Sequence, residues 1–424
     1  MLQVHILREE KQRVIHGLEK RGIRNAEELI ATVIQHDDAR KDTQRKLDDL
    51  KAKSNTASRA IGELMKAGKA AEANALREEV ARSKDEVKSL EEQMARSSEA
   101  MTKALYAIPN VPHQKVPAGG GAKDNIVVHE HGTIPTLPSD SLPHWELIKK
   151  FDIIDFELGT KISGAGFPVY KGKGAKIQRA LINFFLDQAA QAGYREIQPP
   201  IVINEASGYG TGQLPDKEGQ MYHITADNLF LIPTAEVPVT NLYRDMILTD
   251  KELPIKNAGY TPCFRREAGS WGAHVRGLNR LHQFDKVEIV QIRKPAESYA
   301  TLEEMCTYVQ GLLEKLELPY RKLLLCGGDM GFNSAMTYDM EVFSAAQNMW
   351  LEVSSVSNFE TYQANRLKLR HKNAEGKIEL LHTLNGSALA LPRILASILE
   401  NNQSNDHIKV PAVLIPYTGF DRID

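Results

Sequence analysis

The chain has 424 residues, of which 42% are hydrophobic, so it can bury a large core divided over two or three domains. Its formal net charge of -2 excludes an overall basic field, and any contact with nucleic acid must come from local patches. Three widely separated cysteines, Cys263, Cys306 and Cys326, argue against a disulfide framework or a zinc cluster and predict a reducing, cytoplasmic location. No run of about 18 apolar residues and no signal-peptide core is present, so we expect no membrane partner.

A long helical hairpin is predicted near the N-terminus. No proline occurs between residues 26 and 108, and two series of residues advance by alternating steps of four and three, the spacing of a coiled-coil seam. Gly68 lies between the series and suits a tight reversal. We therefore expect an N-terminal domain over 1–108 with two antiparallel helices, each spanning about 50–60 Å. The series are Leu29, Val33, His36, Arg40, Thr43, Leu47, Leu50, Ser54, Ala57, Ile61 and Leu64, and then Ala73, Leu76, Val80, Ser83, Val87, Leu90, Met94, Ser97, Met101, Ala104 and Ile108.

The hairpin alone does not define a function. A coiled coil is most often a dimerisation element or a spacer, and acidic residues match the basic residues of this outer face almost one for one. The central turn excludes a continuous parallel coiled coil. The pattern therefore indicates an arm that folds on itself, with a seam that is polar at its base, at His36, Arg40 and Thr43.

Residues 109–144 are predicted to form a linker and a mobile loop. The stretch 109–128 contains three prolines and the consecutive glycines 119–121, a composition that regular helices and strands do not tolerate.

Residues 145–424 are predicted to form an α+β domain. A helical pattern over 175–194 is followed by a strand pattern with Pro199 and Pro200, which favours a sheet edge. Further strand patterns with short connections predict a mainly antiparallel sheet flanked by helices. They cover 228–237, 254–267, 283–292, 321–330, 338–358 and 378–384. The sequence contains no P-loop and no dinucleotide-binding glycine fingerprint, so any nucleotide site must be of another type.

The segment 264–293 is the most informative part of the chain. It predicts two strands joined by a polar loop, with Arg265 and Glu267 on one side and Phe284 and Glu288 on the other. This combination suits a nucleotide, because an Arg neutralises a phosphate, a Glu accepts from the amino group of a base and a Phe stacks on the base. Each residue alone also has an ordinary interpretation, as a surface charge, a core side chain or half of an ion pair.

A second segment, 381–400, adds Arg393. We expect a turn at Gly386 and Ser387, followed by an apolar-periodic helix with Arg393 near its start.

Together these segments resemble a known family. FRRE at 264–267 with HQF at 282–284 resembles motif 2 of the class II aminoacyl-tRNA synthetases, and GSALALPR at 386–393 resembles motif 3. With PTAEVPVTN at 233–241 and LEVSSVSNF at 351–359, the chain resembles the bacterial seryl-tRNA synthetases over essentially its whole length. The resemblance implies a tRNA-binding hairpin, a class II catalytic domain over 145–424, and attachment of serine to serine tRNA through seryl-adenylate with consumption of ATP.

The resemblance assigns a role to each matching residue. Arg265 bridges the α-phosphate of ATP and the serine carboxylate, and Arg393 lies near the far phosphates. The ATP-binding residues are Arg265, Arg266, Glu267, Phe284, Glu352, Val353, Ser354, Ser355 and Arg393, and the serine-binding residues are Thr234, Ala235, Glu236, Glu288 and Ser387. Glu352 and Ser355 also hold Mg²⁺ with ATP, since hard oxygen ligands suit this ion, and no zinc is expected.

The resemblance also implies partners. The hairpin binds the long variable arm of serine tRNA, the segment 175–203 builds a homodimer, and the selenocysteine tRNA is a further substrate. The motif 2 loop departs from the family at Trp271, Ala273, His274 and Val275, where polar and basic residues are usual, and Arg266 replaces a small residue. Arg276 and Arg280 remain for the acceptor end of the tRNA.

Two other functions use the same motifs. A ligase that loads an amino acid onto a carrier protein would keep the catalytic segments and lack the arm, whereas the heptads are unbroken here. A non-catalytic RNA-binding scaffold would have lost Arg265, Glu267 or Arg393, and all three are present.

Overall fold

The computed structural model describes residues 1–268 and 276–424, which divide into two compact units. The first comprises Met1–Glu19 and Ile23–Pro109, and the second comprises Lys20–Gly22 and Asn110–Asp424. In the described part of the chain, no helix has both the length and the apolar character needed to cross a membrane.

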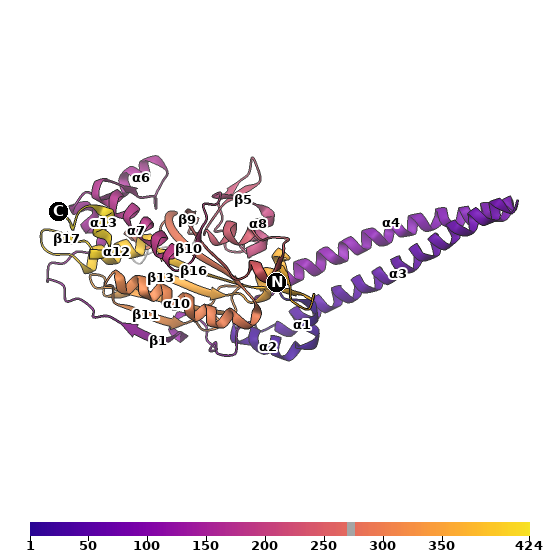
Figure 1. Cartoon of the computed structure of the whole chain (residues 1–424), viewed down its shortest axis with the longest axis horizontal. Helices are drawn as coiled ribbons and strands as arrows, with labels where there is room; N and C mark the ends of the chain where they lie inside the picture. The colour runs from indigo at the N-terminus through magenta and orange to yellow at the C-terminus, as the bar shows by residue number, and fades with distance from the viewer. Residues whose placement is uncertain (269–275) are drawn as a thin grey trace. The chain divides into compact units, whose positions relative to one another are not determined.

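The first unit is dominated by an antiparallel pair of long helices, α3 (Ala26–Lys66) and α4 (Ala70–Ala107), preceded by α1 (Val4–Glu9) and α2 (Lys11–Lys20) (Figure 1). The chain reverses at Gly68, whose φ of 75° suits glycine, and the N–H of Lys69 donates to the carbonyl of Leu64 at 3.0 Å. The seam predicted for α4 is the less exposed face of that helix. The predicted coiled coil is confirmed.

The predicted seam is wrong at the base of α3. Val33 is buried there as predicted, but Ile30 and Asp37 are buried in place of the predicted Leu29 and His36. Burial opposes the ionisation of Asp37, but hydrogen bonds from Lys41, Arg40 and Arg8 outweigh it and lower its pKa to about 2. Because Arg8 comes from α1, the heptad spacing within α3 cannot indicate this charged cluster.

The second unit contains an eight-stranded sheet with the order β1-β11-β12-β13-β16-β10-β9-β4 (Figure 1). All neighbouring pairs are antiparallel except β4 and β9. The strands are β1 (Ile126–His131), β4 (Arg195–Glu196), β9 (Ile255–Phe264), β10 (Gln283–Arg293), β11 (Tyr320–Leu324), β12 (Met336–Ser344), β13 (Met349–Asn358) and β16 (His382–Ala390). The predicted fold class, a helical hairpin with an antiparallel sheet flanked by helices, is confirmed.

Three helices cover one face of this sheet. The opposite face carries polar side chains together with Val290 and Ile292, which pack against shorter helices. Val356 on β13, Gly386 on β16 and Ile289 on β10 lie side by side in register. The side chains of Val356 and Ile289 belong to the main hydrophobic core. That core includes residues of α7 (Gly172–Gln191), α10 (Ser298–Lys315) and α12 (Leu391–Asn401). Because side chains alternate along a strand, the adjacent row points to the opposite face.

Short elements complete the second unit. The helices are α5 (His144–Lys150), α6 (Phe156–Ile162), α8 (Glu205–Thr211), α9 (Glu236–Asn241), α11 (Thr361–Leu367) and α13 (Ile415–Thr418), with 3₁₀ turns that include η4 (Gly277–Asn279). The strands are β2 (Ile154–Asp155), β3 (Val169–Tyr170), β5 (Val202–Asn204), β6 (His223–Ile224), β7 (Leu229–Leu231), β8 (Ile247–Thr249), β14 (Arg370–Lys372), β15 (Ile378–Leu380), β17 (Ile408–Lys409) and β18 (Arg422–Ile423).

Two local predictions are wrong. The expected linker contains β1, an exposed strand that pairs with the edge of the sheet at β11. The expected turn at Gly386 and Ser387 is the middle of β16. A side chain at Gly386 would place its Cβ 3.2 Å from Val356 and 3.5 Å from Ile289, so the glycine permits close packing within the sheet and makes no turn.

Candidate active site

Pairing of β9 with β10 brings Arg265 beside Phe284. Phe284 pairs with Cys263, and Cys263 precedes Arg265 by two residues, so their side chains share a face. The Arg265 guanidinium carbon lies 5.2 Å from the centre of the Phe284 ring. The backbone N–H of Arg265 donates to the carbonyl of His282 at 3.0 Å, which continues the pairing just beyond β9. An exposed cation on a half-buried ring forms a platform that suits a base and its phosphate.

Glu267 and Arg266 lie immediately beyond this platform. Glu267 has a φ of 51°, and its carboxylate accepts from Arg280 Nη1 at 2.6 Å. The backbone N–H of Arg266 donates to the carbonyl of Gln220 at 2.9 Å, while its side chain is exposed.

A β-bulge places Glu352 and Ser355 on one face of β13. Glu341 pairs with Glu352 and Met340 pairs with Ser354, which leaves Val353 as the extra residue. In a regular strand, residues three apart point to opposite faces, so the bulge brings Glu352 and Ser355 together. Ser355 pairs with Asp339 on the neighbouring strand β12. The buried Oδ1 of Asp339 has no hydrogen-bond partner among the described residues.

The Asp339 carboxyl is electrostatically unusual. Burial, followed by the nearby charge of Glu352, raises the pKa of Asp339 well above the ordinary value. The hydrogen bond from Ser355 acts in the opposite direction and lowers this pKa. Asp339, Glu352 and Ser355 therefore form an oxygen-rich group that a divalent cation would stabilise.

Arg393 reaches the same group from α12. Its Nη1 donates to the carbonyl of Glu352 at 2.7 Å and lies 3.7 Å from the carboxylate, and its Nε donates to the carbonyl of Asn279 at 3.1 Å. α12 begins at Leu391 directly after β16, with Pro392 in its first turn, so Arg393 is placed in the first turn of a well-buried helix.

Thr234, Ala235 and Glu236 form the start of α9, and all three are buried. The Thr234 hydroxyl accepts from the N–H of Glu236 at 3.2 Å, and the Glu236 carboxyl accepts from Gln363 Nε2 at 2.7 Å. Gln363 in turn accepts from the hydroxyl of Thr383 at 2.7 Å. Burial raises the pKa of Glu236 to about 7, with the neighbouring Glu288 adding to the effect.

Glu288 lies directly opposite Ser387, and the Ser387 hydroxyl donates to the Glu288 carboxylate at 3.3 Å. Lys286 lies two residues earlier on the same face of β10, and its Nζ is 2.6 Å from that carboxylate. Both charged side chains are buried, so each compensates the charge of the other.

The sheet therefore brings nearly all of the predicted residues together. Glu288, Ser387 and Ser355 stand in the row next to Ile289, Gly386 and Val356, on the face away from the three helices. The side chains of Val353 and Ser354 are buried, and the hydroxyl of Ser354 donates to the carbonyl of Ser387 at 2.6 Å. Any contact that these two make with ATP would be through their backbone.

Sequence reasoning missed Lys286, Asp339 and Gln363. Lys286 had a signal, because it precedes Glu288 by two residues and so shares its face of a strand. Asp339 and Gln363 had none, since their contacts cross between strands and helices that are distant in the sequence. Trp271, Ala273, His274 and Val275 lie outside the described residues.

A metal cluster of protein side chains is not found. Within 1–268 and 276–424, no group of three or more His, Cys, Asp or Glu side chains is arranged to hold a metal ion. A cation at Glu352 and Ser355 would need further ligands from a bound molecule.

Comparisons with known proteins agree on one family. A model of the tRNA synthetase class II core domain (G, H, P, S and T) matches residues 222–402, and a model of the seryl-tRNA synthetase N-terminal domain matches residues 1–112. A serine–tRNA ligase of Salinibacter ruber is 48% identical over 425 residues, which cover 100% of this chain and 99% of that protein.

Solved structures give the same result. The seryl-tRNA synthetase of Pyrococcus horikoshii complexed with ATP is 29% identical, with a TM-score of 0.88 over 100% of this chain and 99% of that chain. The cytoplasmic serine–tRNA ligase of Naegleria fowleri in complex with AMP is 25% identical, with a TM-score of 0.86 over 100% and 99% of the two chains.

All strands of the antiparallel sheet except β1 and β4 lie within the segment that matches the class II core domain, so the sheet defines the catalytic core of a class II aminoacyl-tRNA synthetase. With its N-terminal helical hairpin, the chain belongs to the seryl-tRNA synthetase family. The predicted family and enzyme class are confirmed.

Proposed function

We propose that this face of the sheet joins serine to the α-phosphate of ATP and then transfers the seryl group to serine tRNA. The chain acts as a serine–tRNA ligase, and the observation that carries the assignment of its site is the shared face of Arg265, Glu288, Ser355 and Ser387. Two anions must meet during activation, so catalysis depends on fixed positive charge and on orientation.

Arg265 would bind the α-phosphate together with the serine carboxylate, because its exposed guanidinium lies beside the ring that would stack on adenine. Arg393 would bind the far phosphates. Glu267 would accept from the adenine amino group while Arg280 holds its carboxylate.

Serine would bind between α9 and β10. Among the described residues Glu236 forms no ion pair, and Lys286 favours its ionised form only through a weaker charge effect. The serine ammonium group would supply the direct positive charge that stabilises the ionised form. Glu288 and Ser387 would hydrogen-bond the serine hydroxyl. Alanine and glycine would lack the hydroxyl that these buried polar groups bind, and loss of such a hydrogen bond is an effective way to reject an analogue.

Mg²⁺ would be held by Glu352 and Ser355 with the phosphates of ATP. The residues fit this ion, because a half-exposed carboxylate, a hydroxyl and the unpartnered Oδ1 of Asp339 supply hard oxygen atoms. When bound, the ion would neutralise phosphate charge. A Glu352→Gln substitution should weaken Mg²⁺-dependent ATP binding in calorimetry without changing ATP binding in EDTA.

The arm would bind the long variable arm of serine tRNA, and the selenocysteine tRNA would be a second substrate. Aminoacylation of both tRNAs, with an alanine tRNA as the control, tests this proposal. Charging of alanine tRNA at a similar rate would contradict it.

The chain would act as a homodimer through the segment 175–203. Ile201 and Val202, which follow the edge strand β4, are each 36% exposed, as expected of apolar residues at a partner surface. Sedimentation should show a dimer at micromolar concentration, and a monomer would count against this interface.

One assay tests the central proposal. Pyrophosphate exchange into ATP, measured across the amino acids, should proceed with serine and require Mg²⁺. Equal exchange with alanine, glycine or threonine would contradict the proposed pocket.

A further inference from the structure

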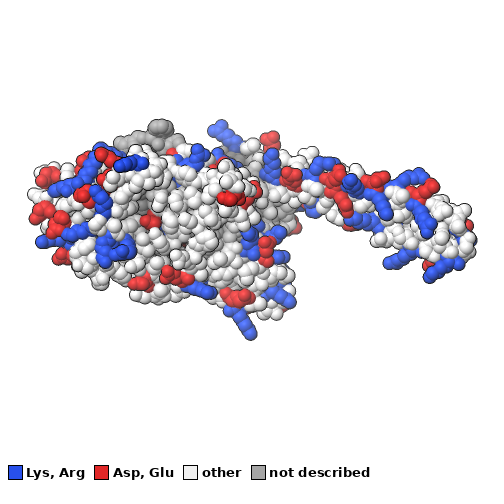
Figure 2. Space-filling model, turned by 90° about the horizontal axis from the view of Figure 1, so that it is seen from above, with Lys and Arg blue, Asp and Glu red and all other residues white. Residues whose placement is uncertain are grey.

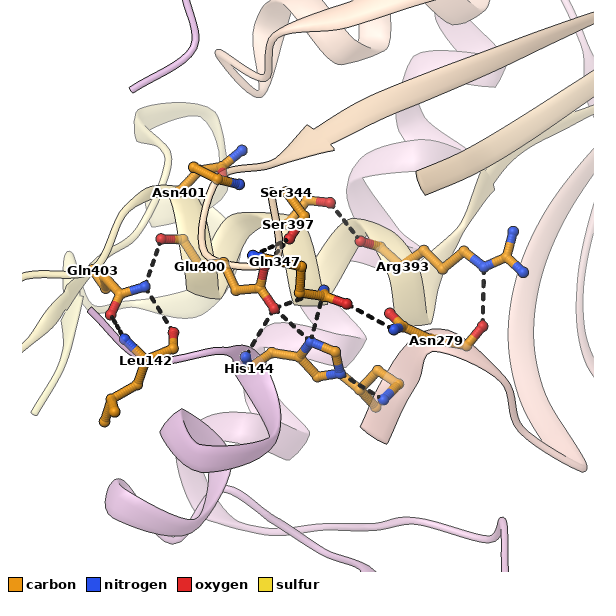
Figure 3. A network of polar contacts seen from close by, with 12 residues as sticks. Leu142, His144, Asn279, Ser344, Gln347, Arg393, Ser397, Glu400, Asn401 and Gln403 are labelled. Atoms are coloured by element: carbon orange, nitrogen blue, oxygen red, sulfur yellow. Dashed lines mark hydrogen bonds and ion pairs between the residues drawn. The ribbon is translucent and has the colours of Figure 1, made fainter. Parts of the chain in front are cut away.

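A buried polar network lies beside the proposed phosphate residues (Figure 3). Its centre is a hydrogen bond between His144, the first residue of α5, and Glu400 on α12, and both side chains are 0% exposed. Neither residue can reach ATP or serine by itself from such a buried position, so any effect on the reaction must pass through other residues.

Glu400 is held by four donors. Its Oε1 accepts from His144 Nδ1 at 2.6 Å, from the His144 backbone N–H at 2.8 Å and from Gln347 Nε2 at 2.9 Å. Its Oε2 accepts from the hydroxyl of Ser344. A buried carboxylate with this many donors has one favourable orientation, because loss of any donor leaves it incompletely paired.

The ring of His144 joins α12 to η4. The backbone N–H of Leu278 donates to His144 Nε2 at 2.8 Å, so the proton of the neutral imidazole resides on Nδ1 and points to Glu400. Gly277 allows this close approach, since a Cβ there would lie 2.3 Å from Nε2.

From Glu400 the contacts lead to Arg393. Gln347 accepts from Asn279 Nδ2 at 2.9 Å, and the carbonyl of Asn279 accepts from Arg393 Nε at 3.1 Å. Arg393 Nη1 donates a second hydrogen bond, to the carbonyl of Glu352 at 2.7 Å. Two acceptors on different edges define the plane of a guanidinium group, which is what binding of a phosphate requires.

We infer that His144 and Gln347 are positioning residues for the activation of serine: they hold Asn279 so that its carbonyl orients Arg393. The inference rests on the proposed role of Arg393 at the phosphates of ATP. It adds two residues from α5 and from the β12–β13 connection to a site otherwise formed by the motif segments.

Gln347→Ala is the first test, because Gln347 lies on a surface connection and its loss should leave the fold intact. In pyrophosphate exchange we expect about a tenfold lower kcat/KM for ATP, the size of one buried hydrogen bond, and a KM for serine within about twofold of the parent. His144→Asn keeps a donor toward Glu400 but removes the acceptor of Leu278, and it should produce the same selective loss.

Gln403→Ala is the matched control. Gln403 binds the backbone of Leu142 through both its amide atoms and so joins the same two segments, but it has no contact with Asn279 or Arg393 in the network (Figure 3). This variant should lower Tm and leave kcat/KM for ATP unchanged.

A double-mutant cycle with Arg393→Lys identifies the route, because lysine has no Nε to donate to Asn279. In that background, Gln347→Ala should change kcat/KM for ATP by less than about twofold. If the two substitutions lower kcat/KM for ATP by independent factors that multiply, or if Gln347→Ala lowers only thermal stability, the inference is overturned while the role of Arg393 stands. An Arg393→Lys enzyme with parental activity would instead overturn the proposed role of Arg393, and this inference with it.

Discussion

The helical arm and the catalytic sheet differ in where most of their charged side chains lie. Along the arm, lysines and arginines alternate with acidic residues in solvent (Figure 2). Beyond the charged cluster at Asp37, the seam consists mainly of small and apolar side chains. The sheet instead buries Glu288 and Lys286, and Glu236 of α9 is buried beside them, so that their charges depend on one another and on hydrogen bonds. The arm can therefore vary in its surface at little cost, whereas a single change in the sheet leaves a buried group without its partner.

The largest effect should follow from removing positive charge at the sheet. Arg265→Ala should slow seryl-adenylate formation by on the order of 10²–10³, because the guanidinium stabilises charge that develops on the phosphate. Single-turnover formation of adenylate measures this step. An activity within a few-fold of the parent would mean that Arg265 does not contact the phosphate.

Deletion of the arm should affect tRNA aminoacylation and leave serine activation nearly unchanged. Replacing residues 29–105 by a short linker should leave serine activation within about twofold, since the site residues lie beyond 230, and lower tRNA aminoacylation by roughly 10² through lost binding. Because the charges of the arm nearly cancel, the arm's share of tRNA binding should depend only weakly on salt. A truncated enzyme that charges tRNA normally would make the arm a spacer.

A smaller effect should appear in the pH dependence of serine binding. The pKa of Glu236 is raised to about 7, so the free enzyme carries this group protonated at pH 6 and ionised at pH 8. The serine ammonium group favours the ionised form, and the KM for serine should therefore fall as pH rises through 7. Glu236→Gln should raise this KM about tenfold at pH 8 and abolish the dependence.

The smallest effect concerns the base of the arm. Asp37→Asn should lower the free energy of unfolding by about 1–2 kcal/mol at pH 7, since three cations lose a buried partner. The pKa of Asp37 is 3.8 when unfolded and about 2 when folded, so its contribution is complete above pH 4 and disappears as pH falls toward 2.

Asp38→Asn is its control. Asp38 also pairs with Arg8 but is 57% exposed, and its substitution should cost less than about 0.5 kcal/mol. Urea unfolding followed by circular dichroism measures both variants, and equal losses would show that burial of Asp37 does not matter.

The sequence predicted the arm and the positions of the main strands along the chain because periodicity is a local property. The seam of α4 and strands such as β10 and β13 repeat with the spacing of their own element. The site residues came from resemblance to motifs, and the sheet brings them to one face. Their roles stay predictions.

Long-range contacts could not be predicted in this way. The bulge at Val353 depends on the register between β12 and β13. The burial of Asp37, where His36 was predicted, depends on its ion pair with Arg8 from another helix. Gly386 has a typical turn composition, yet the close packing of Val356 and Ile289 requires it within a strand. In each case the decisive neighbour is remote in the sequence.

The central position of β16 limits how this enzyme could be redesigned for another amino acid. The hydroxyl of Ser387 faces Glu288 on β10, while its carbonyl accepts from Ser354 on β13, so one residue contacts both the proposed serine-binding strand and the proposed ATP-binding strand. A substitution that widens the pocket at β16 would also disturb the strand that carries Glu352. Thr234, at the entrance to α9, lies outside these paired strands, and selection for a larger substrate should begin there.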